Sequence, residues 1–190
     1  MEKNRLEAFS DGVIAIILTI MVLDLKVPKE STVEAMLAQW PVFIAYAMSY
    51  AIVFMLWLNH HQLFASLEKI NHSMLMRNGL VLFAMSFIPF VTAYAGESKW
   101  SEPLAVSLYG LVMAAVSLGF VRLRLAAIAC AQNERDAVNH KVEFELGMIL
   151  IAAFLAGAAC AWYVPRWALI IYVLASLLRQ LHRRSVNKGQ

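Results

Sequence analysis

The sequence predicts an all-α fold, in the form of a polytopic membrane protein with six transmembrane helices in a single domain, residues 1–190. Composition is the first reason: 61% of the 190 residues are hydrophobic and 15% are charged, whereas a soluble domain has roughly 45–50% apolar and about 25% charged residues. The second reason is that apolar runs recur with lengths near the roughly 20 residues that a spanning helix needs. The third is the uneven placement of lysine and arginine between these runs.

The first three spans are bounded by helix-stop and helix-start residues. The first run ends before Pro28, and the spacing of Ser31 and Glu34 is that of a capping box, which predicts a short helix before the second span. Pro89 predicts a kink inside the third span, because proline removes a backbone donor. The six expected spans cover residues 6–25, 41–58, 78–94, 103–121, 146–163 and 167–181.

The second half of the chain combines small residues with one polar stretch. Ser101 and Pro103 provide a cap and a first-turn proline for the fourth span. The polar stretch 131–145 is expected to form a helical hairpin outside the membrane. Small residues spaced four apart, such as Gly110 with Ala114 and Gly157 with its alanine neighbours, predict close helix packing.

Basic residues fall mainly on one side of the six-span arrangement. The other side holds four of the 16 lysines and arginines: Lys26, Lys29, Lys99 and Arg166. Twelve against four is a strong bias under the positive-inside rule, so both termini are expected in the cytoplasm. Because these charges are set by topology and do not line one face, no nucleic-acid partner is expected. The bias thus predicts a multi-pass protein whose environment is the lipid bilayer.

Motifs for enzymatic chemistry are not found in the sequence. It has no nucleotide-binding loop, no GxSxG and no paired intramembrane carboxylates, so no catalytic residue is assigned and the chain is not expected to be an enzyme. His60 and His61 point about 100° apart on a helix, which disfavours a zinc site. A potassium filter of the TVGYG type is absent too. No metal or cofactor is therefore expected, and side chains must line any ion path.

Three groups of residues resemble a known family. They are Arg5-x-x-x-Phe9-Ser10-Asp11-Gly12 with Ala15-Ile16 and Thr19 to Leu23, Trp57-Leu-Asn-His-His61 with Phe64, and Arg77-Asn78 with Ser86-Phe-Ile-Pro89-Phe90. This pattern is similar to that of the transmembrane protein 175 family, potassium channels of lysosomes and prokaryotic membranes. One six-helix unit per chain resembles the prokaryotic members. The resemblance implies a homotetramer in the prokaryotic cell membrane, with K⁺ as the permeant ion.

Helix geometry places Ile16, Thr19 and Leu23 on one face of the first span. At 100° per residue they fall within about 60° of one another, whereas Asp11 lies about 140° from Ile16. Apolar residues of a membrane helix usually meet lipid or other helices, and this reading of the stripe stays open. The resemblance implies that the stripe lines the pore, with Ile16 and Leu23 forming a hydrophobic constriction around Thr19.

Asp11 is expected to support the helix and not to bind the ion. A charge inside a membrane needs a partner, and several polar residues fall near the same membrane edge as Asp11. The resemblance implies a structural polar network of Arg5, Phe9, Ser10, Asp11, Trp57, His61 and Asn78.

Three functional hypotheses follow from the sequence. The first is a potassium-permeable leak-type channel lined by the first helix of each subunit. The second keeps the channel but makes protons or mixed cations the permeant species. The third is a non-conducting membrane assembly or carrier, in which the first helix is only a packing element.

Overall fold

The structure, a computed structural model, describes residues 2–128, 130–131 and 133–188, with side chains described as far as Ser176. This part of the chain is helical, apart from turns and one isolated bridge between Leu67 and Ala131, so the predicted all-α fold is confirmed. The elements in order are α1 (Lys3–Ile20), the 3-10 turn η1 (Met21–Asp24), α2 (Val33–Leu37), α3 (Trp40–Ala65), α4 (His72–Met85), α5 (Ile88–Glu97), α6 (Pro103–Ile128), α7 (Glu134–Cys160) and α8 (Pro165–Lys188).

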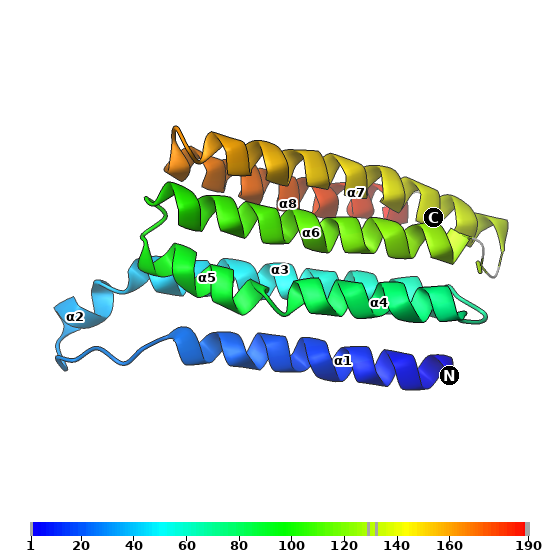
Figure 1. The fold of residues 1–190 in the computed structure, drawn as a ribbon, viewed down its shortest axis with the longest axis horizontal. Coiled ribbons are helices and arrows are strands. Elements are labelled where there is room, and N and C mark those ends of the chain that lie inside the picture. The colour runs from blue at the N-terminus through cyan, green and yellow to red at the C-terminus, as the bar shows by residue number, and fades with distance from the viewer. Residues whose placement is uncertain (1, 129, 132, 189–190) are drawn as a thin grey trace.

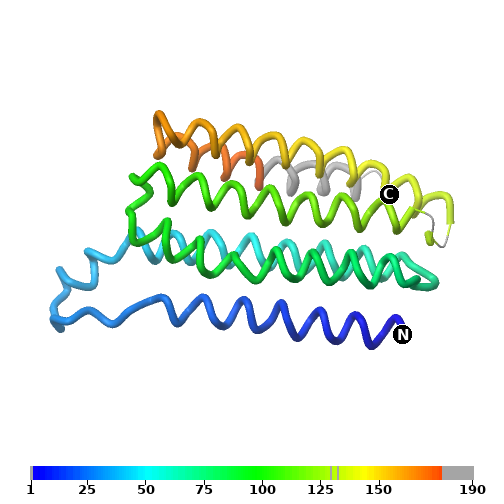
Figure 2. The backbone as a smooth tube through the Cα atoms, in the orientation of Figure 1, coloured from blue at the N-terminus to red at the C-terminus, as the bar shows by residue number. Residues whose placement is uncertain are grey.

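The long helices lie side by side in one bundle, with α1 at one edge and α7 and α8 at the other (Figure 1). The backbone passes back and forth along the bundle axis, and the start of α1 lies at the same end as the connection from α3 to α4 (Figure 2). The ammonium group of Lys3 donates a hydrogen bond to the Leu67 carbonyl at 2.8 Å across this end. We call it the Lys3 end, and the opposite one the Asp24 end.

Five segments of the described chain are long and apolar enough to cross a membrane. They are Lys3–Asp24, Trp40–Ala65, His72–Glu97, Pro103–Ile128 and Glu134–Cys160. The predicted sixth span, 167–181, falls on α8, whose described apolar part is the shorter Pro165–Ser176, and its last five residues lie outside the described side chains. The sixth crossing therefore stays a prediction.

The helices extend beyond the predicted spans at the Lys3 end. The second and fourth spans were expected to stop at residues 58 and 121, but α3 reaches Ala65 and α6 reaches Ile128. The helical hairpin expected over residues 131–145 is wrong, because α7 begins within it, at Glu134, and runs on into the apolar segment. Polar residues do not end a helix at the membrane edge, since its backbone bonds are internal and water solvates the side chains.

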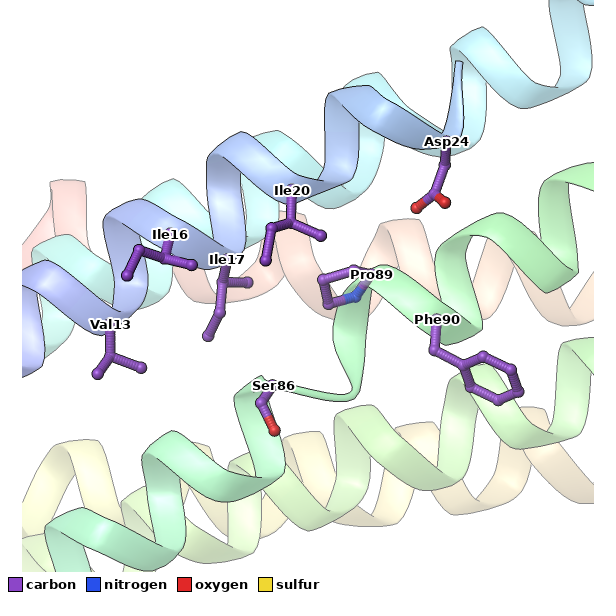
Figure 3. A pocket seen from close by; sticks show the side chains of 8 residues that line it. All are labelled: Val13, Ile16, Ile17, Ile20, Asp24, Ser86, Pro89 and Phe90. Atoms are coloured by element: carbon purple, nitrogen blue, oxygen red, sulfur yellow. The ribbon is translucent and has the colours of Figure 1, made fainter. Parts of the chain in front are cut away.

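The kink predicted from Pro89 is present. The third span starts at His72, six residues before its expected start, and is broken into α4 and α5 between Met85 and Ile88. Proline has no N–H to donate to the carbonyl four residues earlier, so the ladder fails at this point. The break lies directly beside α1 (Figure 3).

Helix α6 forms the centre of the bundle and packs against α4, α5, α7 and α8, whereas the main helix contacts of α1 are with α3, α4 and α5. Two glycines make room for the Tyr172 ring of α8. A Cβ atom would lie 2.2 Å from the Tyr172 hydroxyl if added to Gly110, and 2.3 Å from ring atom Cε1 if added to Gly157. The predicted small-residue packing thus serves a ring inserted between α6 and α7.

A candidate conduction helix and the polar network behind it

Helix α1 has one face buried in the bundle and one face that the described part of the chain leaves exposed. Its buried residues include Leu6, Ile14 and Ile17. The three residues of the predicted stripe, Ile16, Thr19 and Leu23, are all exposed, with 58% exposure at Ile16 and 75% at Leu23. The sequence pattern thus correctly separates the two faces, and the stripe lies on the face that the rest of the chain leaves uncovered.

Two local features shape this stripe. The Thr19 hydroxyl is 3.1 Å from the Ala15 carbonyl and 2.9 Å from the Ile16 carbonyl, so its oxygen keeps its acceptor capacity. Leu23 lies in the tighter 3-10 turn η1, and so the 100° spacing assumed for an α-helix does not hold at its position. It nevertheless stays on the exposed side.

An open groove separates α1 from the broken third span. It has a volume of about 480 Å³ and is lined mainly by apolar side chains, with Ile16 and Ile20 on α1 facing Pro89 and Phe90 on α5. Asp24 lies at one end of this groove (Figure 3). The stripe residue Ile16 therefore lines this groove and also lies on the exposed face of α1.

Asp11 points away from the stripe and into the bundle. The Trp57 indole Nε1 donates a hydrogen bond of 2.8 Å to its carboxylate. A bond from a neutral donor to an ionised acceptor is stronger than one between neutral groups, so this contact ties α1 firmly to α3. The His61 ring stacks on Trp57 with ring centroids 5.9 Å apart, but His61 itself is exposed.

A second set of bonds holds Ser10, on the buried side of α1. The Ser10 hydroxyl donates to the Leu6 carbonyl at 2.8 Å and accepts from the Asn78 amide at 2.9 Å. The Asn78 oxygen is in turn 2.7 Å from Nε2 of His60, which is buried. Asn78 thus joins α1 to α3 through His60 and not through the predicted His61, because adjacent helical residues point about 100° apart.

The two remaining residues of the expected network lie at its margin. Arg5 and Phe9 are exposed and line a second groove, of about 350 Å³, between α1 and α4, together with Asn78 and Gly79. Within the described residues the Arg5 guanidinium is not joined to the hydrogen bonds of Ser10 or Asp11. The structure thus brings together Ser10, Asp11, Trp57 and Asn78, and it leaves Arg5 at the surface.

Sequence reasoning missed a polar cluster next to this network, which we call the Arg124 cluster. It consists of Asn59 on α3, Ser66 directly after α3, Arg124 on α6, and His140 and Glu143 on α7. Arg124 was counted among the topology charges, but it is only 6% exposed. One feature of the sequence could have indicated this burial: the apolar residues that follow Arg124 show that the helix continues past the charge. In the described residues, no group of three potential metal ligands occurs.

Comparisons with known proteins agree with this arrangement. The sequence profile of a family described as endosomal/lysosomal potassium channel TMEM175 matches residues 5–89. A protein of Chryseobacterium sp. (strain P1-3), named a potassium channel, is 36% identical over 193 residues, covering 100% of this chain and 98% of the relative. The chain belongs to the TMEM175 family. This TMEM175 protein is therefore a multi-pass membrane protein of an ion-channel family and not an enzyme.

Two further TMEM175 proteins are similar to this chain, one in structure and one in sequence. The crystal structure of a lysosomal potassium-selective channel TMEM175 homolog from Chamaesiphon minutus matches with a TM-score of 0.80 and 29% identity, covering 93% of this chain and 97% of that one. The human protein, named an endosomal/lysosomal proton channel, is 41% identical over 114 residues, which cover 54% of this chain and 22% of the human one. The family profile ends at Pro89, so the Arg124 cluster draws mainly on helices beyond it.

Proposed function

We propose that this TMEM175 chain forms a potassium-permeable leak-type channel whose pore is lined by α1 of each subunit. The observation that carries the proposal is the division of α1 into two faces. One face is held by the bonds of Ser10 and Asp11, and the other exposes Ile16, Thr19 and Leu23, which the described residues leave uncovered.

In a closed ring of subunits, the exposed α1 faces surround the symmetry axis and line an ion path. One helix cannot enclose a pore, and closed point-group symmetry is the usual solution for soluble and membrane homo-oligomers alike. We infer a homotetramer, as the resemblance implies. Ile16 and Leu23 then form two apolar rings about 10 Å apart along the axis, with the Thr19 hydroxyls between them. Such rings narrow the path and gate it by dewetting.

The polar network serves to hold α1 in place in this proposal. Asp11 is a structural residue, because its carboxylate accepts from Trp57 and is turned away from the stripe. Ser10 and Asn78 fix the rotation of α1 about its own axis, and His60 extends the contact to α3. A rotation of α1 by one residue, about 100°, would remove Ile16 from the axis.

The proposed placement is a prokaryotic cell membrane with six spans in one domain and both termini in the cytoplasm. The support is the count of twelve basic residues against four on the two sides. The Lys3 end of the bundle is then the cytoplasmic end. The permeant species is K⁺, and the proposal includes no cofactor and no bound structural metal.

The test is ion flux through purified protein in liposomes. We expect Ile16→Ala and Leu23→Ala each to raise potassium flux severalfold and to relax the preference for potassium over sodium, because each widens an apolar ring. The matched control is Leu118→Ala, which truncates an exposed leucine of α6 that is 46% exposed and lies outside α1. Unchanged flux in both α1 variants, beside a conducting wild type, would remove the pore assignment.

A proton or mixed-cation channel is the second candidate. It is favoured by the human relative, which is named a proton channel and is 41% identical over the matched residues. Reversal potentials under bi-ionic gradients of potassium, sodium and protons decide between the candidates, since each predicts a different sign. A wild-type protein that conducts none of these ions would instead support the non-conducting assembly or carrier.

A further inference from the structure

Arg124 is a buried cation in an apolar helix, and its guanidinium makes two specific bonds. One nitrogen, Nη2, donates to the Asn59 side-chain oxygen at 2.6 Å, and the other, Nη1, lies 2.9 Å from Nδ1 of His140. Placing a charge inside a membrane protein is costly, so such residues usually have a function and a fixed partner. Arg124 thereby joins α3 to α7 through α6.

The neighbours of His140 determine which of its ring nitrogens carries the proton. The Ser66 hydroxyl donates to the Leu63 carbonyl at 2.7 Å, so its oxygen is left to accept from His140 Nε2, 3.0 Å away. Arg124 has only donors, and therefore His140 Nδ1 must be an acceptor. Both contacts are satisfied by neutral imidazole with its proton on Nε2. A second proton on Nδ1 removes the acceptor that His140 offers to Nη1 of Arg124.

The charges around His140 come from two helices. Arg124 faces it from α6, and Asp136 and Glu143 lie one turn before and after it on α7. The Glu143 carboxylate is also 3.9 Å from the Arg124 guanidinium. The contact from the end of α3, made by its C-cap residue Ser66, is uncharged. Protonation of His140 therefore sets two cations against each other at 2.9 Å, and the two carboxylates offset this repulsion only in part.

The Arg124 cluster lies next to the bonds that hold α1. Asn59, which Arg124 binds, precedes His60 on α3, and His60 is bonded to Asn78, which is bonded to Ser10 of α1. The order of contacts is therefore α7, α6, α3, α4 and α1. A change at His140 reaches α1 through side chains that are in direct contact or adjacent in sequence, and not through a loop.

We propose that Arg124 is a positioning residue of the channel, which requires a neutral His140 as its acceptor and keeps α3 and thereby α1 in the conducting arrangement. Protonation of His140 releases Arg124 and lowers flux. The conduction part rests on the proposed function, whereas the protonation part is independent of it. The cluster lies at the Lys3 end, so the proton comes from the compartment that this end faces.

The experiment compares His140→Gln, which cannot be protonated, with His140→Lys, which carries a permanent charge. Potassium flux in liposomes is recorded from about pH 8 to about pH 4, where protein imidazoles titrate. We expect wild-type flux to fall about fivefold or more on acidification, the size of a typical coupling between two sites. His140→Gln should lose this fall, and His140→Lys should show low flux throughout. His72→Gln, on an exposed histidine of α4, is the control and should behave as wild type.

A second measurement separates this inference from the channel assignment. The thermal stability of the purified protein is followed over the same pH range for wild type and His140→Gln. A fall with acidity that His140→Gln abolishes supports the Arg124–His140 contact even if no variant conducts, and in that case only the proposed function fails. An identical pH response of stability in wild type and His140→Gln, or an identical pH response of flux when the wild type conducts, overturns the inference.

Discussion

The two ends of the bundle are held together by different means. At the Lys3 end, polar side chains of α1, α3, α4, α6 and α7 are bonded to one another around Asn78 and Arg124. At the Asp24 end, the Tyr172 ring fills the space above two glycines, and the buried side-chain bonds described there are made by neutral hydroxyls such as those of Ser49 and Tyr109. Buried charge is therefore found at the Lys3 end, whereas the ion pair of Lys26 and Glu97 at the Asp24 end is exposed and side-chain volume decides the packing there.

This difference matters most for α1. Its side-chain hydrogen bonds to other helices are at the Lys3 end, through Ser10 and Asp11, whereas Ile17 and Met21 near the Asp24 end are buried by apolar contacts alone. Directional bonds fix the rotation of a helix more strictly than apolar contacts do. We therefore expect substitutions of the bonded side chains at the Lys3 end to change flux as well as stability. Substitutions in the helix packing of the Asp24 end, away from the stripe residues, should change stability alone.

The largest effect is expected at the glycines of the Asp24 end. Gly110→Ala and Gly157→Ala each place a methyl group within 2.2–2.3 Å of Tyr172, and overpacking of this kind costs about 3 kcal/mol. Thermal inactivation in detergent measures the loss. Tyr172→Phe removes the hydroxyl that Gly110→Ala meets, so it should partly rescue Gly110→Ala but not Gly157→Ala. Equal rescue of both variants would contradict the assigned contacts.

A smaller effect is expected at the Lys3 end. Trp57→Phe leaves the Asp11 carboxylate without its indole donor, at a cost of about 2 kcal/mol. Because the bond orients α1, the potassium flux of Trp57→Phe should change as well. The glycine variants, measured at a temperature where they remain folded, should keep the wild-type flux. A double-mutant cycle of Trp57→Phe with Asp11→Asn isolates the pair. Strictly additive effects on stability would show that this contact does not hold α1.

The smallest effect is expected from a neutral bond at the Asp24 end. Tyr109→Phe removes the 3.0 Å contact with the Ser49 hydroxyl but leaves the bond from Thr92 to Ser49, so about 1 kcal/mol should be lost. Flux and its pH dependence should match wild type, since none of these groups titrates near neutral pH and none contacts α1. A changed pH profile of flux in this variant would contradict the proposed difference between the Lys3 end and the Asp24 end.

Local patterns predicted some features of the fold and candidate site and missed others. Hydrophobic length gave five segments that are long and apolar enough to cross a membrane. Pro89 gave the break between α4 and α5, and helical periodicity put Ile16 and Asp11 on different faces of α1. The helix ends were predicted too early, because charged residues at a membrane edge were taken as stops. His60 and Arg124 were missed, since neither periodicity nor spacing tells which polar residue of a helix meets a partner from a distant segment.

The sequence by itself determined that this chain is a multi-pass helical membrane protein and which stripe of its first helix stays apolar. Both follow from composition and from the 3.6-residue period, which depend on neighbours in sequence. Tertiary structure alone decided that the stripe is the uncovered face, that Asn78 selects His60 over His61, and that Arg124 is buried against His140. These outcomes depend on how residues far apart in sequence pack, and packing fixes which of two adjacent polar side chains faces inward.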